Sequence, residues 1–271
     1  MKAAVIQYNI HSGDAKANRG KAAALLAEAG KMGAEIVLLP ELWNCGYDLD
    51  RLEELAETSR GLSAKMLQKA AKEQHMFIIG GSIAEKKDGK YYNTSLAINQ
   101  KGEIVQKYRK AHLFSLGLHE DEYFMAGDEW VQAETPWCKV GMMICYDLRF
   151  PEFARNLALR GAKLLTMPSQ WPRSRDEARY ILCRARAIEN RCFVMAANPV
   201  GIDEGNGFKY AGGSMIIDPY GKILVEGPDE EGVFMADIDF SPWLSLDDQS
   251  PTIDVFADRR AILDEIDDSQ I

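Results

Sequence analysis

Two stretches of this chain, Gly33-Ala-Glu-Ile-Val-Leu-Leu-Pro-Glu-Leu-Trp43 and Gly161-Ala-Lys-Leu-Leu-Thr-Met-Pro-Ser-Gln-Trp171, share their Gly, Ala, Pro and Trp residues at the same spacing. Each reads as a glycine turn followed by a buried strand that ends at proline. A second set of four matching residues comes after each stretch, in the same order and at the same intervals. These are Ser95, Ile98, Gly102 and Ile104, which recur as Ser214, Ile217, Gly221 and Ile223. The chain therefore contains an internal repeat, although a match this short can also arise by chance.

The pattern of apolar residues predicts alternating strands and helices in the first half of the chain. Strands are expected at residues 2–8, 36–39 and 77–79, helices at 18–32, 53–58 and 63–74, and a hairpin at 95–107 around the turn 99–102. Strands that alternate with helices, with one hairpin in each half, predict α-β-β-α layers related by pseudo-symmetry. We therefore expect an α/β fold, a four-layer α-β-β-α sandwich.

Length and composition are those of an ordinary globular protein. The chain has 271 residues, of which 46% are hydrophobic and 27% charged, and a single large sandwich can absorb this length. We expect one domain over residues 1–240. The stretch 241–271 differs, because two prolines interrupt it and acidic residues dominate it, so we expect a tail on the surface or on a partner subunit.

Charge and residue usage exclude several classes of function. A net charge of −9 argues against a sequence-independent nucleic-acid binder, which needs a basic face. We expect no membrane span, because no apolar run is long enough, and a cytoplasmic location, because the first residues lack the features of a signal peptide. Five cysteines without paired spacing fit reduced thiols, and four histidines without an HxxxH pair make a metal site improbable. No cofactor is expected.

Cys145 has the sequence context of a nucleophile. It ends the apolar run 140–144, which reads as a buried strand, and a helix is expected to follow and to reach about Arg160. A thiol near the positive end of a helix dipole should have a lowered pKa and form the reactive thiolate. The alternative is a small buried residue at a strand end. Asp147 has a structural explanation as the helix N-cap, and packing is the better explanation for Cys45, Cys138, Cys183 and Cys192.

Three charged residues could carry chemistry together with Cys145. Glu41 follows Pro40 at the end of an apolar strand, where open α/β sheets place their sites and where a carboxylate can act as a general base. The matching position in the second half is Ser169, so the repeat does not require an acid there. Lys110 follows the first hairpin, and the second hairpin has no matching lysine. Taken singly, Glu41, Lys110 and Glu120 could each be solvated surface charges.

Three separated motifs resemble, in order, the catalytic motifs of the carbon-nitrogen hydrolase or nitrilase superfamily. They are Leu38-Leu-Pro-Glu-Leu42, Lys107-Tyr-Arg-Lys-Ala-His-Leu-Phe114 and Gly141-Met-Met-Ile-Cys-Tyr-Asp-Leu-Arg-Phe-Pro-Glu152. The stretches 184–190 and 198–201 resemble later motifs of the superfamily, and the spacing of Glu120, Phe124 and Gly127 resembles the segment with its second active-site glutamate. One departure is Ala178-Arg179, where many relatives carry His-Trp, and it puts the acyl-side pocket in doubt.

The resemblance implies an amidase with Cys145 as nucleophile, Glu41 as proton acceptor and Lys110, with the backbone N–H of Tyr146, as oxyanion donors. Glu120 would orient Lys110. Within the superfamily, the Cys145 motif looks most like the omega-amidase branch, whose small substrates carry a carboxylate, such as 2-oxoglutaramate. Four residues are candidates for binding such a substrate: Arg149, Trp171, Arg173 and Arg175.

Two other functions remain open from the sequence. One is a nitrilase or N-carbamoyl hydrolase that uses the same triad, and the other is a catalytically silent binding protein that keeps the fold. The intact triad weighs against the silent protein, because such a protein has no physical need for all three residues. Relatives are commonly homodimers or larger, so a homo-oligomer is also expected.

Overall fold

The computed structural model describes residues 1–205 and 207–241. Its first compact unit spans Met1–Ile238, and the second unit begins at Asp239. The predicted tail, 241–271, lies outside the described residues except for Ser241. The site and all the elements described below belong to the first unit.

One sheet forms from the first half of the chain together with the last strand. Its order is β15-β1-β2-β3-β5-β4, and β6 also pairs with β5. Strands β1, β2 and β3 are parallel, and their nearly continuous apolar sequences fit a parallel sheet that is covered on both faces. The bounds are β1 (Lys2–Gln7), β2 (Ile36–Leu38), β3 (Phe77–Ile79), β4 (Ile83–Lys87), β5 (Lys90–Ile98), β6 (Ile104–Arg109) and β15 (Gly232–Asp237).

The second sheet repeats this plan with the order β14-β13-β10-β9-β8-β7. Strands β8, β9 and β10 are parallel, as β1, β2 and β3 are, and β13 and β14 form the second hairpin. The bounds are β7 (Gln132–Glu134), β8 (Lys139–Met142), β9 (Ala162–Pro168), β10 (Phe193–Ala197), β13 (Met215–Ile217) and β14 (Ile223–Glu226). A separate two-stranded ribbon is made by β11 (Val200–Ile202) and β12 (Lys209–Ala211).

The predicted internal repeat is present in the hairpins down to their irregularities. Ile98 pairs with Ile104 after a register shift in β5–β6, and Ile217 pairs with Ile223 after a register shift in β13–β14. The turn glycines, Gly102 and Gly221, have φ of +79° and +78°, a conformation that favours glycine. The two matching glycines therefore reflect the same hairpin built twice.

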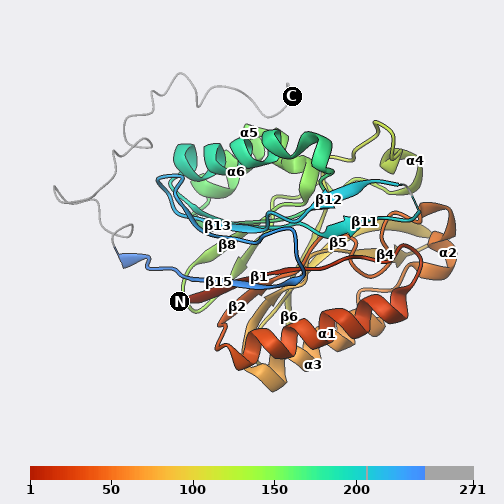
Figure 1. Cartoon of the computed structure of the whole chain (residues 1–271), viewed down its shortest axis with the longest axis horizontal. Coiled ribbons are helices and arrows are strands. Elements are labelled where there is room, and N and C mark those ends of the chain that lie inside the picture. The colour runs from red at the N-terminus through yellow and green to blue at the C-terminus, as the bar shows by residue number, and fades with distance from the viewer. Residues whose placement is uncertain (206, 242–271) are drawn as a thin grey trace. The chain divides into compact units, whose positions relative to one another are not determined.

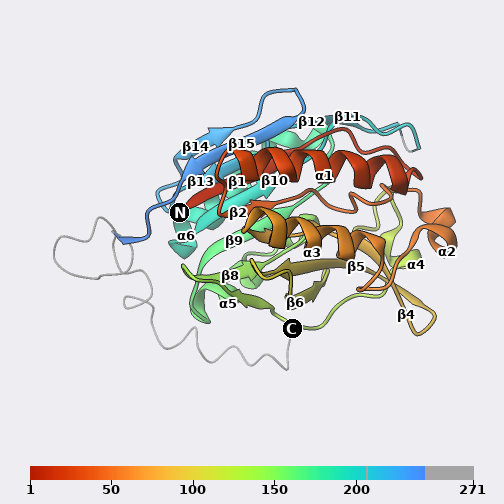
Figure 2. The same ribbon diagram turned by 90° about the horizontal axis from the view of Figure 1, so that it is seen from below.

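Helices cover the outer faces of the two sheets, which pack against each other through contacts of β1 with β10 and β13. Figure 1 shows α1 (Ala15–Lys31) and α3 (Leu62–Gln74) on one side of the sheets and α5 (Pro151–Leu159) and α6 (Asp176–Asn190) on the other, and Figure 2 shows α1 and α3 side by side. The four-layer α-β-β-α sandwich expected from the sequence is confirmed.

Most predicted elements are found, with one clear error. Helix α1 begins earlier than expected because the Asp14 side chain accepts a hydrogen bond from the backbone N–H of Ala17 at 2.9 Å. The helix predicted at 53–58 is wrong beyond Leu55: α2 covers only Leu52–Leu55, and Glu57 instead bridges to Glu85 beside β4. The remaining short helices are α4 (Glu120–Tyr123) and the 3-10 turns η1 (Leu49–Arg51), η2 (Cys145–Arg149) and η3 (Arg173–Arg175).

Gly81 offers a test of how tightly its backbone packs against Pro40. Gly81 and Gly89 both have positive φ, +59° and +74°, but a Cβ at Gly81 would lie 1.9 Å from the Pro40 carbonyl oxygen, whereas one at Gly89 would meet nothing within 4 Å. We expect Gly89→Ala to lower the free energy of unfolding by about 1 kcal/mol through backbone strain. Gly81→Ala should cost at least about 2 kcal/mol more, because backbone cannot yield as a side chain can.

Urea unfolding of the two variants measures both costs. Because the backbone strain is common to both, equal losses for Gly81→Ala and Gly89→Ala would contradict the tight packing against Pro40.

Candidate active site

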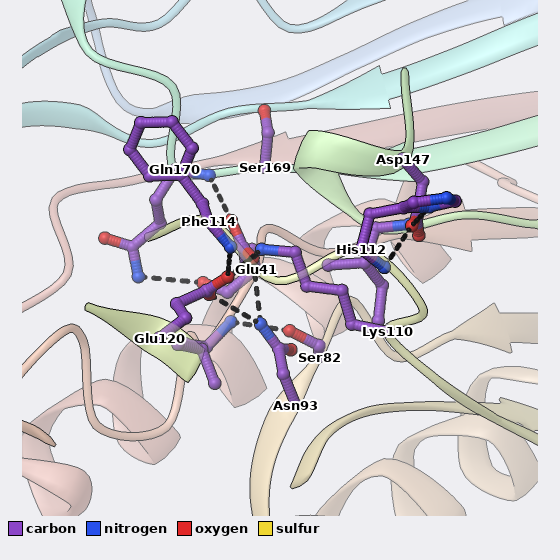
Figure 3. Close-up of polar contacts among 12 residues, drawn as sticks. Glu41, Ser82, Asn93, Lys110, His112, Phe114, Glu120, Asp147, Ser169 and Gln170 are labelled. Carbon is purple, nitrogen blue, oxygen red and sulfur yellow. Dashed lines mark hydrogen bonds and ion pairs between the residues drawn. The ribbon is translucent and has the colours of Figure 1, made fainter. Parts of the chain in front are cut away.

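Glu41 lies where the two halves of the molecule meet. It follows β2 and Pro40, and its backbone N–H donates to the carbonyl of Ser169, the equivalent residue of the second half, at 3.3 Å. The side chain is fully buried. Oε1 accepts a hydrogen bond from Asn93 Nδ2 at 2.9 Å, and Oε2 accepts one from the backbone N–H of Gln170 at 2.9 Å. Both carboxylate oxygens are therefore held from opposite halves (Figure 3).

Lys110 directly follows β6 and points into the same buried centre. Its backbone N–H donates to the Asn93 carbonyl and its carbonyl accepts from the Gly127 N–H, both at 2.9 Å. Its ammonium lies 2.8 Å from Glu41 Oε1 and 2.9 and 2.7 Å from the two carboxylate oxygens of Glu120. The ammonium thus joins two carboxylates that would otherwise repel each other.

Glu120 is the first residue of α4 and is also fully buried. Besides Lys110, its carboxylate accepts hydrogen bonds from the backbone N–H of Phe114 at 2.7 Å, the hydroxyl of Tyr47 at 3.0 Å and Asn93 Nδ2 at 3.3 Å. A buried carboxylate with this many donors is well compensated for the loss of water.

The pKa values within this cluster follow from burial and charge. Burial alone lowers the pKa of the Lys110 ammonium, but the charges of Glu120 and Glu41 outweigh burial and raise it above its usual value. Burial raises the pKa of Glu120, and the Glu41 charge adds to this, while Lys110 opposes both. Lys110 therefore stays an ammonium at neutral pH.

Cys145 is the first residue of η2, just after β8, and its φ of +45° places it in the left-handed region. This sharp turn carries the thiol toward Glu41 and Lys110. Burial raises the thiol pKa well above its ordinary value, the Glu41 charge raises it further, and Lys110 only partly offsets them. The lowered pKa expected from a helix dipole is therefore wrong, because α5 begins only at Pro151 and burial dominates.

A pocket opens onto Cys145, and its mouth carries two cations. Arg149 lies over the Trp171 ring at 5.0 Å and Arg175 lies over the Phe114 ring at 5.4 Å. Among residues 1–205 and 207–241, neither guanidinium forms an ion pair with a carboxylate. Arg173, by contrast, does not line this pocket and pairs with Asp229 at 2.7 Å. The lining includes Tyr47, Phe114, Cys145, Tyr146, Arg149, Gln170, Trp171, Arg175 and Phe208.

Arg179 takes no part in this pocket. Its guanidinium is fully buried, pairs with Asp176 at 2.7 Å, and donates to the carbonyls of Gly213 at 3.0 Å and Gly212 at 3.2 Å. The departure from relatives at this position thus supports the loop between β12 and β13. It does not add a charge to the lining described above.

At the other four cysteines, burial outweighs the effect of every neighbouring charge on the thiol pKa. All are free thiols, and burial raises the pKa of each to about 12. Cys145 differs from them in its neighbours, which are the buried Glu41, Lys110 and Glu120. The four are Cys45, Cys138, Cys183 and Cys192.

The sequence did not single out three residues that shape the site. Asn93 bridges Glu41 and Glu120, Tyr47 binds Glu120, and Gln170 holds Glu41 through its backbone N–H and through its side-chain amide, which donates to the Glu41 carbonyl at 3.0 Å. Asn93 gave no clear signal, because its strand β5 also contains Lys90, Thr94 and Ser95. Tyr47 and Gln170 had none, because their partners come from distant segments.

The described part of the chain contains neither a metal-binding cluster nor a membrane-spanning helix. No group of three or more His, Cys, Asp or Glu side chains there is arranged to hold a metal ion. In the same residues, every helix is too short or too polar to cross a membrane.

Known proteins are similar to this chain over nearly its whole length. The 2-oxoglutaramate amidase of Bacillus subtilis is 40% identical over 249 residues, covering 92% of this chain and 95% of its own. The omega-amidase NIT2 of Homo sapiens is 35% identical over 267 residues, covering 96% and 95%.

Solved structures of known proteins have a similar fold. XC1258 from Xanthomonas campestris, a CN-hydrolase superfamily protein with an arsenic adduct in its active site, superposes with a TM-score of 0.83 at 32% identity, covering 89% of this chain and 91% of its own. Nit3 of Saccharomyces cerevisiae, a member of the nitrilase superfamily, gives 0.81 at 30% identity, covering 93% and 97%.

The model of the carbon-nitrogen hydrolase family matches residues 2–246. Together with the amidase relatives and the fold, this match shows that the chain belongs to the carbon-nitrogen hydrolase family and is an amidase that acts on carbon–nitrogen bonds other than peptide bonds.

Proposed function

We propose that this chain hydrolyses the amide of a small carboxylate-bearing compound through a thioester on Cys145. The observation that carries the proposal is a single pocket that combines three features. Cys145 lines it and is 8% exposed, and the buried cluster of Glu41, Lys110 and Glu120 lies beside Cys145. Two arginines at the mouth of the pocket have no carboxylate partner among the described residues. The cluster supports the chemistry, and the arginines support the choice of substrate.

In the first half-reaction the Cys145 sulfur attacks the amide carbon. Because its pKa is raised, the thiol is neutral in the resting enzyme, so Glu41 accepts the thiol proton as the carbon–sulfur bond forms. Glu41 then returns this proton to the departing nitrogen, which leaves as ammonia. The acyl group stays on Cys145 as a thioester.

The tetrahedral intermediate needs donors for its oxyanion. The backbone N–H of Tyr146 is available because the first N–H groups of a helix have no partner within it. Lys110 supplies the positive charge. Its ammonium makes two contacts with Glu120 and one with Glu41, so the oxyanion takes the place of one contact with Glu120 while the ion pair persists.

In the second half-reaction water attacks the thioester. Glu41 takes a proton from this water, a second tetrahedral intermediate forms on the same donors, and the thiol of Cys145 is released with the proton. The products are a carboxylic acid and the regenerated enzyme. Glu120 holds Lys110 in place throughout.

The arginines and the relatives support an acidic substrate. A guanidinium matches a carboxylate with two parallel hydrogen bonds, so Arg149 or Arg175 can bind the end of the substrate remote from the amide. Trp171 forms the apolar wall beside Arg149. Relatives named 2-oxoglutaramate amidase and omega-amidase favour a short dicarboxylic acid with one amidated end.

We further infer a cytoplasmic location and assembly with a second copy of the chain. Five free thiols, four of them buried, suit a reducing compartment. Ile181 and Ile188 are 57% and 50% exposed one heptad apart on α6, and this apolar face supports a homo-oligomer.

Removing the nucleophile should abolish the reaction. We expect Cys145→Ala to release no ammonia above background from 2-oxoglutaramate, because no thioester can form. Glu41→Gln, which keeps the side-chain shape, should lower kcat at least about 100-fold through loss of the base. Retained ammonia release by Cys145→Ala would overturn the mechanism.

The same assay distinguishes the other chemistries of the family. A simple aliphatic amide, a nitrile and an N-carbamoyl amine are run beside 2-oxoglutaramate on the unaltered enzyme. If only the nitrile or the carbamoyl compound reacts, the proposed substrate class is wrong while the triad stands. Binding without turnover of any compound would favour the silent protein.

Lys110→Met tests the oxyanion role. The change keeps the volume but removes one donor, which typically costs ~3 kcal/mol in barrier height, or about 100-fold in kcat. Because it also leaves two buried carboxylates unpaired, Lys110→Met/Glu120→Gln serves as a folding control, with thermal melting measured for both. Near-normal turnover in either folded variant would refute the role.

Arg175→Gln and Arg149→Gln test recognition of the substrate carboxylate. A hydrogen bond to a charged group contributes about 1.5–3 kcal/mol, so we expect KM for 2-oxoglutaramate to rise roughly 10–100-fold in at least one variant. KM for a neutral aliphatic amide should not change. Arg173→Gln is the matched control, because Arg173 is already paired with Asp229. An equal effect of all three changes would refute carboxylate binding at the pocket mouth.

A further inference from the structure

We propose that the buried carboxylate of Asp147 is a positioning group that fixes the Lys110 segment against the Cys145 turn, with Tyr108 and His112 as its partners. This inference rests on the roles proposed above for Cys145 and Lys110. It assigns Asp147 a function beyond the capping of η2, in which it is the third residue. The prediction that Asp147 is the N-cap of the following helix is wrong, because the N-cap of α5 is Phe150.

On one side, Asp147 closes the turn that presents the nucleophile. Its Oδ2 accepts a hydrogen bond from the backbone N–H of Ile144 at 2.8 Å, and its own backbone N–H donates to the Ile144 carbonyl at 3.1 Å. Cys145 lies inside this closed turn with its φ of +45°. A left-handed conformation at a residue other than glycine persists only where surrounding contacts impose it, and these two bonds impose it here.

On the other side, the same carboxylate holds the residues that flank Lys110. The Tyr108 hydroxyl donates to Oδ2 at 2.6 Å, and the backbone N–H of His112 donates to Oδ1 at 3.0 Å. His112 Nδ1 also lies 2.8 Å from Oδ1. Figure 3 shows His112 beside Asp147. Tyr108 in turn accepts a hydrogen bond from the backbone N–H of Ala111 at 3.0 Å.

A single oxygen therefore connects the two catalytic segments. Oδ2 of Asp147 binds both the N–H that precedes Cys145 and the hydroxyl two residues before Lys110. A helix cap needs only the first of these contacts. Tyr108 lies in β6 and His112 in the segment after it. These contacts therefore join the Cys145 turn, which follows a strand of the second sheet, to the first sheet.

Burial makes this connection stiff. Asp147 and Tyr108 are fully buried, and the His112 ring stacks on Phe150 with ring centroids 3.7 Å apart. A fully buried carboxylate cannot readily exchange a lost partner for solvent, so its donors stay fixed. A shift of about 1 Å between reacting groups can cost roughly 100-fold in rate. The contacts of Asp147 therefore matter for Lys110 and the Tyr146 N–H, which must both reach the carbonyl oxygen of the substrate.

Tyr108→Phe is the sharpest test, because it removes one hydroxyl and keeps the packed ring. The matched control is Tyr8→Phe: Tyr8 is equally buried, and its hydroxyl has no hydrogen-bond partner within the described residues. We expect Tyr108→Phe to lower kcat for 2-oxoglutaramate about 10-fold at unchanged KM, and Asp147→Asn about 100-fold. Tyr8→Phe should leave kcat unchanged.

Reaction of Cys145 with methyl methanethiosulfonate separates positioning from a general loss of structure. This reagent transfers a methylthio group to the thiol and releases methanesulfinic acid, so it needs no carbonyl oxyanion and no help from Lys110. Because the Ile144 contact remains in Tyr108→Phe, its labelling rate should stay within about twofold of the unaltered enzyme while amide turnover falls. Cys145→Ala gives the background from the other thiols.

The outcomes are distinct. Normal kcat in Tyr108→Phe overturns the proposal, and so does a parallel fall in kcat, labelling rate and melting temperature, which would indicate a purely structural role. If Lys110→Met itself turns over normally, the proposed oxyanion role fails instead. An inactive Lys110→Met beside a normal Tyr108→Phe would refute the positioning role alone.

Discussion

The contact of the Lys110 ammonium with two buried carboxylates is the constraint on which the site depends. Glu41 and Glu120 are both fully buried, and without it their carboxylates would lie close together with no positive charge between them. Lys110 reaches both because its backbone is fixed between β5 and the segment at Gly127. Removing Lys110 would leave two buried carboxylates unpaired, whereas removing either carboxylate would leave the ammonium paired with the other.

The repeated architecture explains why such a cluster can form. Glu41 and Ser169 occupy matching positions after matching strands, and the backbone of one bonds the backbone of the other. The pseudo-symmetry thus brings two strand ends to one point. The chemistry comes from breaking the symmetry: the Ser169 hydroxyl donates to Asn198 Oδ1 and the Ala197 carbonyl and stays outside the charged cluster.

Much of this was predictable from local sequence. Matching glycines and hairpin residues predicted the two halves, and the resemblance of three separated motifs to one superfamily predicted that Glu41, Lys110 and Cys145 would converge. What local sequence could not supply was the environment created by distant segments. The pKa of the Cys145 thiol rises because burial and the Glu41 charge outweigh the effect of the short turn. Arg173 is paired because Asp229, 56 residues away in the sequence, lies beside it, whereas Arg175 has no carboxylate partner in the part of the chain that the structure describes.

A neutral thiol beside a carboxylate is a consistent resting state for such an enzyme. A thiolate at Cys145 would add a further negative charge to a buried site that already holds two carboxylates and one ammonium. Proton transfer to Glu41 becomes favourable only when the sulfur can bond to carbon and the new negative charge moves to an oxygen facing Lys110 and Tyr146. Reactivity is thereby tied to the presence of a carbonyl in the pocket, and the same burial that raises the pKa protects the thiol between turnovers.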